Sequence, residues 1–230
     1  MTNTEYTIYF AGELFDHKDL SGNALLASHI GRVSDGRYRC VLPQDMEQTS
    51  ARAVQVRNQD LATLLKCDLA IFNFDGVELD SGTVVEFMYA KMLDIPCLVL
   101  RSDFRRSGDQ GAGERNRDRE SDDWNLMASF YPRTRKLQFD AMEWYQEERA
   151  RGDGLEALTE RLYRRIASAV VTQLDAVRAE QPLLQGSRAD AERIYLWALR
   201  FPGSGLDKLV PDPGEIVAGK AAKGLLGLTI

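Results

Sequence analysis

A glutamate and an aspartate lie six residues apart in the segment 80–86, which reads DSGTVVE. Glu86 is followed by Phe87 and further apolar residues, so its carboxylate stands at the edge of an apolar helix and should be partly desolvated. Such a carboxylate can attack an anomeric carbon when a second group assists departure of the leaving group. Asp80 and Asp68 are the candidates for that second group.

The same residues also have an ordinary structural interpretation. Asp80 or Ser81 can cap the helix that starts here, and Glu86 could simply face water. Gly82, in the first turn, would let a ligand approach the backbone closely. The choice between the two interpretations depends on the elements that surround the segment.

Strand and helix signals alternate over the first hundred residues. Short runs of β-branched and aromatic residues predict strands at 6–11, 38–42, 67–74 and 95–100. Apolar residues at helical spacing predict helices at 20–32, 51–65 and 80–93. Strands that alternate with helices form βαβ units and a parallel sheet. We therefore expect an α/β fold, a flavodoxin-like or Rossmann-like parallel sheet flanked by helices.

The predicted sheet indicates where chemistry would take place. In open α/β sheets, ligands bind outside the carboxyl ends of the strands. The loops after Phe10 and after Phe74 are at such ends, and the segment 80–86 follows the second of them. Both interpretations of Glu86 remain open at this point, but its expected location favours a ligand site.

The chain changes character after residue 100. Residues 101–123 are charged and contain glycine, which predicts a solvated loop, although lids and subunit contacts also have this composition. Residues 155–179 form a long amphipathic pattern, and a further helix is predicted at 189–199. We expect an α/β domain over 1–150, and over 151–230 a C-terminal helical extension that packs on the domain or on a partner subunit.

Composition excludes several classes of partner. The net charge of -6 and the pI of about 5.1 provide no field that attracts nucleic acid polymers or anionic membranes, and no segment is long enough to span a membrane. Cys40, Cys67 and Cys97 lack metal or redox spacing, so a reducing, cytoplasmic setting fits best. No metal or cofactor motif is visible, and His17 and His29 are a loop residue and a helix-face residue.

Four separated segments carry a more specific pattern. Residues 9–15 read YFAGELF, of the form Y-x-A-G-x-x-F, and residues 80–90 have the form D-x-G-x-x-x-E-x-x-Y-A. Asp68 precedes the third predicted strand, and residues 125–127 read NLM. In this order the segments resemble the nucleoside 2-deoxyribosyltransferase family over roughly residues 6–127.

The resemblance implies an enzyme that moves 2-deoxyribose between purine and pyrimidine bases, as in nucleotide salvage, without a cofactor. Its partners would be 2'-deoxynucleosides and free nucleobases. Glu86 would be the nucleophile, forming a covalent sugar ester, and Tyr9, otherwise an ordinary strand aromatic, would orient its carboxylate. Asp80 would handle the proton that the departing base requires. The overall reaction would be a two-step displacement with retention.

The resemblance also implies residues that bind the substrate. Asp80 and Asp68 would bind the base edge, Gly12 would allow close backbone approach, and Phe15 would stack on the base. Asn125 would reach the sugar 5'-hydroxyl in the pocket of a neighbouring subunit, so the protein would be a homo-oligomer whose pockets are completed by that neighbour. A plain helix cap is an equally good interpretation of Asn125 from the sequence alone.

Two positions depart from the family pattern. Met88 stands where the family usually has glycine, which could crowd helix packing. Glu13 stands where many members have proline or another neutral residue, and its charge beside the pocket would disfavour a 5'-phosphate.

Two other functions remain open. A nucleoside 5'-monophosphate N-glycosidase would use the same glutamate with water as acceptor, and would need a phosphate cradle to which Ser81, Arg101 and Ser102 could contribute. A non-catalytic nucleotide-binding module would bind without cleaving, but it has no need of a nucleophile.

Overall fold

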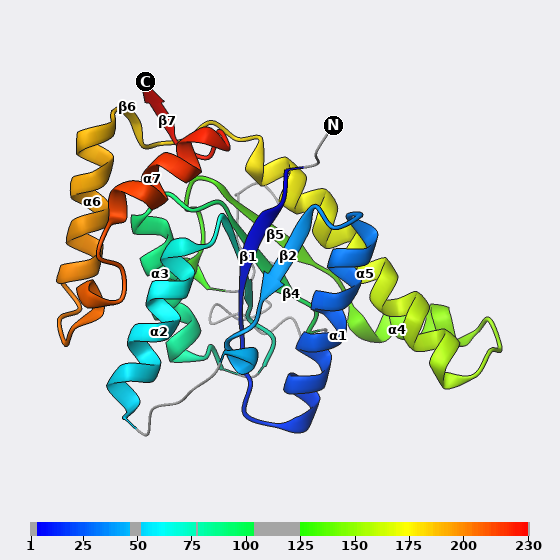
Figure 1. Ribbon diagram of the computed structural model, residues 1–230. Helices are drawn as coiled ribbons and strands as arrows, with labels where there is room; N and C mark the ends of the chain where they lie inside the picture. Colours follow the sequence, from blue (N-terminus) through cyan, green and yellow to red (C-terminus); the bar gives the residue numbers. More distant parts are fainter. Residues whose placement is uncertain (1–3, 47–51, 77, 104–124, 230) are drawn as a thin grey trace.

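The computed structural model describes residues 4–46, 52–76, 78–103 and 125–229. A five-stranded parallel sheet with the order β2-β1-β3-β4-β5 forms its centre (Figure 1). Its strands are β1 (Tyr6–Ala11), β2 (Tyr38–Val41), β3 (Leu69–Asn73), β4 (Cys97–Arg101) and β5 (Thr134–Gln138). Strand order reverses between β1 and β3, and such a switch point is where doubly wound sheets open a ligand crevice.

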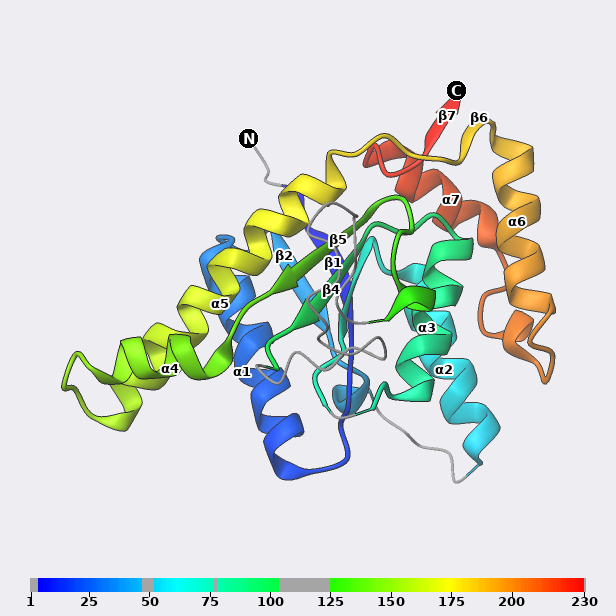
Figure 2. The ribbon, with the colours of Figure 1, turned by 180° about the vertical axis from the view of Figure 1, so that it is seen from behind.

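Helices cover both faces of the sheet, as Figures 1 and 2 show from opposite sides. One face is covered by α1 (His17–Val33) and α5 (Leu155–Arg178), and α4 (Ala141–Arg149) packs on α5. The other face is covered by α2 (Ala53–Lys66) and α3 (Ser81–Met92). Because both faces are buried, the central strand β3 is almost continuously apolar rather than alternating.

The C-terminal segment adds an outer layer. It contains β6 (Gln185–Ser187), α6 (Arg188–Arg200), α7 (Pro213–Ala222) and β7 (Gly227–Thr229), and β6 pairs with β7 in a small parallel sheet. Apolar residues of α6 and α7 share one buried cluster with α2 and α3, so this layer lies outside those two helices (Figure 1). Three short 3-10 turns complete the described elements: η1 (Pro43–Asp45), η2 (Leu126–Ala128) and η3 (Leu206–Lys208).

The predicted fold class is confirmed, and the predicted strands and helices agree with the observed ones to within a few residues. No pattern in the sequence indicated the strands β5, β6 and β7 or the helices α4 and α7. Most of the charged stretch 101–123 lies outside the described residues. The division at residue 150 stays a prediction, although α5 belongs by its packing to the same core as β1, β3 and β4.

Candidate active site

A phenol and a carboxylate meet at the switch point of the sheet. Tyr9 lies in β1 and is fully buried, and its hydroxyl donates a hydrogen bond of 2.6 Å to Oε1 of Glu86. Glu86 lies in α3, which is held over β3 by the buried side chains of Phe87 and Ala90. The fold thus brings together two residues that are 77 positions apart in the sequence.

Burial dominates the electrostatics of this pair. It raises the pKa of Glu86 to about 7; the hydrogen bond from Tyr9 opposes the rise, and the nearby charges of Asp60 and Asp80 add to it. The pKa of Tyr9 is raised as well, first by burial and then by the charge of Glu86. Tyr9 therefore keeps its proton at neutral pH and remains a hydrogen-bond donor to the carboxylate.

A third acidic group, Asp60, was not predicted from the sequence. It lies in α2, and its charge acts on both Tyr9 and Glu86. Its Oδ1 atom is buried and has no hydrogen-bond partner among the described residues, and burial raises the pKa of Asp60 to about 6. One signal in the sequence could have indicated Asp60. It is an aspartate directly before the apolar run that starts at Leu61, on the apolar side of an amphipathic helix.

Asp80 combines a structural contact with proximity to the nucleophile. Its Oδ2 atom caps α3 by accepting hydrogen bonds from the backbone N–H of Thr83, at 2.7 Å, and from the Thr83 hydroxyl, at 2.8 Å. A Cβ atom on Gly82 would lie 3.1 Å from the same oxygen, so a larger residue there would crowd the cap. The cap interpretation of Asp80 is therefore correct, and its charge also reaches Glu86.

The loop after β1 lies close to the end of β3. A Cβ atom on Gly12 would stand 3.0 Å from Cβ of Asn73, which is tighter than an ordinary contact, so this close approach favours glycine. Burial, followed by the charges of Asp19 and Asp80, raises the pKa of Glu13, which places its carboxylate among acidic neighbours. Phe15 is 77% exposed and has no ring partner among the described residues, so it is free to stack on a ligand.

Asp68 is not brought to this site. It precedes β3, whereas Glu86 lies in the helix that follows β3. Its carboxylate accepts hydrogen bonds from the backbone N–H and the hydroxyl of Thr7, at 2.8 Å and 3.0 Å, and pairs with Lys223 at 2.7 Å. Asp68 therefore fastens the starts of β1 and β3 to the C-terminal segment, and the geometry gives no support to a role at the base edge.

Asn125 occupies the position of a cap. Its side-chain oxygen accepts hydrogen bonds from the backbone N–H groups of Met127 and Ala128, at 2.9 Å and 3.0 Å, and so starts η2. Met127 is 77% exposed. Asn125 is thus absent from the contacts of the Tyr9–Glu86 pair within this chain.

The residues considered for a phosphate cradle are mostly engaged elsewhere. Arg101 is buried and donates a hydrogen bond of 2.9 Å to the carbonyl oxygen of Phe74. The hydroxyl of Ser102 donates to Asp75 at 2.6 Å. Ser81 alone of the three is exposed, in the first turn of α3.

Two further searches cover the described part of the chain. No three histidine, cysteine, aspartate or glutamate side chains there are grouped as metal ligands would be. Nor does that part contain a helix whose length and apolar character would suffice to cross a membrane.

Fold and site together define an α/β protein whose candidate ligand site, with a partly buried carboxylate and a buried phenol, lies at the switch point of a doubly wound sheet. The chain belongs to the nucleoside 2-deoxyribosyltransferase family, whose model matches residues 8–142, more than half of the 230 residues. Membership supports a glycosyl-transferring enzyme that acts on nucleosides.

Several solved structures show partial similarity. A conserved protein from Enterococcus faecalis is 30% identical over 47% of this chain and 70% of its own, with a TM-score of 0.41. A 2-deoxyribosyltransferase from Leishmania mexicana is 25% identical over 60% and 92%, with a TM-score of 0.44. A CMP N-glycosidase from Clostridium botulinum is 12% identical over 63% and 97%, with a TM-score of 0.36. Among curated proteins, none matches this chain.

Proposed function

We propose that this protein transfers 2-deoxyribose from a 2'-deoxynucleoside to a free purine or pyrimidine base, with Glu86 as the nucleophile. The observation that carries the proposal is the 2.6 Å hydrogen bond between Tyr9 and Glu86 at the switch point of the sheet. A buried tyrosine that points its hydroxyl at a partly buried carboxylate fixes the position of that carboxylate, as covalent attack on a sugar carbon requires.

The first step breaks the N-glycosidic bond. Ionised Glu86 attacks C1' of the sugar through an oxocarbenium-like transition state, and the base leaves with a proton. Asp60 suits the transfer of that proton, because a pKa of about 6 keeps part of its population protonated near neutral pH. Asp80 remains a second candidate for the same step, since its charge also reaches Glu86.

The second step reverses the first with a different base. The incoming base attacks C1' from the vacated face, the ester bond to Glu86 breaks, and the proton on the attacking nitrogen returns to the acid. Two inversions give net retention. Deoxyribosides should react faster than ribosides, because an electron-withdrawing 2'-hydroxyl destabilises the developing positive charge. Gly12, Gly82 and Phe15 would line the pocket, the glycines by close backbone approach and the phenylalanine by stacking on the base.

A second copy of the chain is proposed to complete the pocket. One stripe of α3 next to Glu86 exposes Val85, Met88 and Met92, and Val85 is 61% exposed. Exposed apolar side chains grouped in this way favour a surface that another protein covers. With this stripe at a subunit contact, Asn125 of one copy would reach the sugar 5'-hydroxyl in the pocket of the other.

Base exchange provides the direct test. Thymidine or deoxyinosine incubated with free adenine or cytosine should give the exchanged deoxynucleoside, detected by chromatography. Glu86→Ala should keep its circular dichroism spectrum and lose exchange, whereas Glu78→Ala, which removes an exposed glutamate just before α3, should remain active. Exchange retained by a folded Glu86→Ala protein would reject the proposed nucleophile.

The hydrolytic alternative is separated by omitting the acceptor base. Release of base from a nucleoside 5'-monophosphate without an acceptor would indicate an N-glycosidase, whereas exchange on nucleosides indicates a transferase. The contacts of Arg101 and Ser102 favour the transferase. Both side chains bond to the chain at Phe74 and Asp75, where they are engaged instead of forming a cradle for a 5'-phosphate. A non-catalytic binding module would bind the nucleoside but form neither released base nor exchanged nucleoside.

A reducing compartment such as the cytoplasm is proposed as the setting. All three cysteines are free: Cys67 and Cys97 are buried, and Cys40 is half-buried. Cysteines that carry no disulfide are typical of proteins kept under reducing conditions.

A further inference from the structure

The C-terminal segment 183–229 lies beyond the 8–142 range matched by the family, yet it packs on the helices that carry the proposed site. Its helices α6 and α7 share a buried cluster with α2, which carries Asp60, and with α3, which carries Glu86 (Figure 1). The position of these two acids therefore depends on packing that the matched range does not supply by itself.

Two tyrosine hydroxyls join α3 to α6. Tyr89, three residues after Glu86 on α3, donates a hydrogen bond of 3.1 Å to the carbonyl oxygen of Ala198. In the opposite direction, Tyr195 of α6 donates one of 3.1 Å to the carbonyl oxygen of Leu93, which ends α3. Both tyrosines are almost completely buried, so each hydroxyl depends on its partner across the interface for a hydrogen bond.

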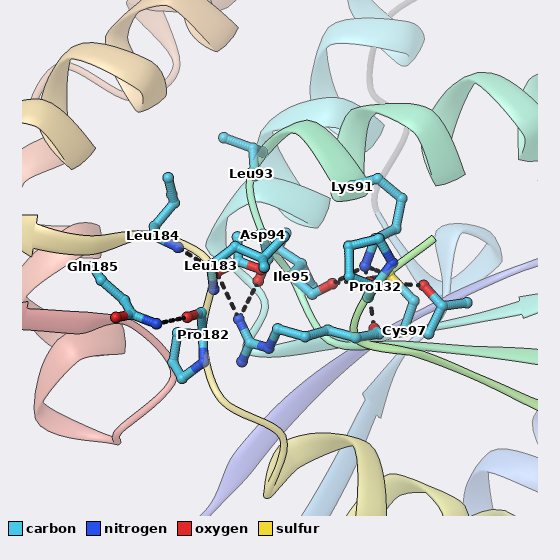
Figure 3. Close-up of polar contacts among 12 residues, drawn as sticks. Lys91, Leu93, Asp94, Ile95, Cys97, Pro132, Pro182, Leu183, Leu184 and Gln185 are labelled. Atoms are coloured by element: carbon cyan, nitrogen blue, oxygen red, sulfur yellow. Dashed lines mark hydrogen bonds and ion pairs between the residues drawn. The ribbon is translucent and has the colours of Figure 1, made fainter. Parts of the chain in front are cut away.

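A third contact fixes the turn after α3. The Oδ2 atom of Asp94 accepts hydrogen bonds from the backbone N–H groups of Leu183 and Leu184, at 2.7 Å and 2.9 Å (Figure 3). The same carboxylate pairs with Arg133 at 2.8 Å, and both side chains are at most 3% exposed. The start of the C-terminal segment is thus tied to the residue that follows the end of α3.

These contacts bear on the nucleophile because Glu86 can be placed only as accurately as the helix that carries it. Small displacements of a reacting group reduce rates strongly, whereas substrate affinity depends on many other contacts. We propose that the segment 183–229 acts as a brace, because its contacts hold α3 at a fixed position relative to β1. Tyr89 and Tyr195 are then positioning residues for Glu86. This inference rests on the proposed function of Glu86.

The test uses the full chain with single hydroxyl deletions. Tyr89→Phe and Tyr195→Phe should each lower kcat for base exchange about tenfold, with KM within about twofold of the wild-type value. Tyr38→Phe is the matched control, because the hydroxyl of Tyr38 bonds Asp175 of α5 on the opposite face of the sheet. It should lower Tm without changing kcat.

An activity-independent measurement accompanies the kinetics. Titration of Glu86 by carboxyl-carbon NMR should show its pKa rising further in Tyr89→Phe and Tyr195→Phe, because a displaced α3 weakens the hydrogen bond from Tyr9 that holds this pKa down. Tyr38→Phe should leave it unchanged. Should one variant fail to fold, the other carries the test alone.

The outcomes separate the two proposals. A wild-type protein that does not exchange bases defeats the proposed function, whereas the NMR titration still tests the brace. An active wild type whose Tyr89→Phe and Tyr195→Phe variants lose only Tm, as Tyr38→Phe does, with an unchanged or lowered pKa of Glu86, overturns the brace.

Discussion

At the scale of single residues, Glu86 in the Tyr9–Glu86 pair suits the proposed function but lowers the stability of the folded state. Burial raises the pKa of Glu86 from 4.5 to about 7, so ionising this carboxyl costs free energy in the folded state that it does not cost in the unfolded chain. The proposed chemistry nevertheless requires the ionised form. A site in which the reactive group destabilises the native state is consistent with a catalytic role.

The pH dependence of stability follows from this shift. Between pH 4.5 and about 7 the folded state binds more protons at Glu86 than the unfolded state, so the free energy of unfolding falls as pH rises through this window. Glu86→Gln removes the titration and should make the protein more stable than wild type by roughly 3 kcal/mol at pH 8. Below pH 4 the difference should vanish. Urea unfolding at both pH values checks it, and an equal difference at the two values would contradict the buried carboxyl.

Removing the phenol isolates its effect on the carboxylate. Tyr9→Phe deletes the donor that lowers the pKa of Glu86, so the ascending limb of the profile of kcat/KM against pH should move above pH 7. At a fixed pH of 7, the rate should fall by about tenfold or more, because the carboxylate is less ionised and less well oriented. A profile that loses height without moving would assign Tyr9 an orienting role alone.

At the scale of elements, Asp80 joins the start of α3 to the chemistry. Asp80→Ala removes both oxygens and should lower stability by about 1 kcal/mol through loss of the cap. Asp80→Asn retains an oxygen acceptor for Thr83 and should restore most of that stability. If Asp80 gives the departing base its proton, base exchange should be slow in both Asp80→Ala and Asp80→Asn. Normal rates in Asp80→Asn would leave Asp80 as a cap only, with Asp60 as the acid.

The sequence predicted those elements that local patterns determine. The strands β1 to β4 and the helices between them were found because buried parallel strands are continuous apolar runs and their helices are amphipathic. Strand β5 was missed because it lies at the edge of the sheet and reads TRKLQ, with mostly exposed side chains. Its place depends on pairing with β4, which no local pattern shows.

Local sequence patterns do not reveal those residues of the candidate site whose position depends on packing between elements. Glu86 and Tyr9 were found because a family motif surrounds each of them. Asp60 has no such motif, and only the packing of α2 against α3 brings its charge to the pair. Asp68 was chosen because the family has an aspartate before its third strand, but here Thr7 and Lys223 occupy its carboxylate at the start of β3.

At the scale of the whole molecule, the buried pair of Asp94 and Arg133 joins three parts of the chain. Asp94→Ala leaves Arg133 buried without its counter-ion and frees two backbone N–H groups of the C-terminal segment. The free energy of unfolding should fall by about 3–5 kcal/mol. Urea titration measures this loss. As a control in the same titration, Asp190→Ala removes an exposed ion pair with Arg193 and should cost less than about 1 kcal/mol.

The proposed assembly predicts that two inactive variants restore each other. Asn125→Asp keeps a side-chain oxygen for the cap of η2 but loses the amide donor, so it should fold and transfer poorly. If the pocket takes Glu86 from one copy and Asn125 from another, half of the pockets in a mixed dimer with Glu86→Ala contain both native residues. Random exchange of subunits should then restore about a quarter of wild-type activity. A mixture no more active than the mean of its two components would place both residues in the same subunit's pocket or remove Asn125 from the site.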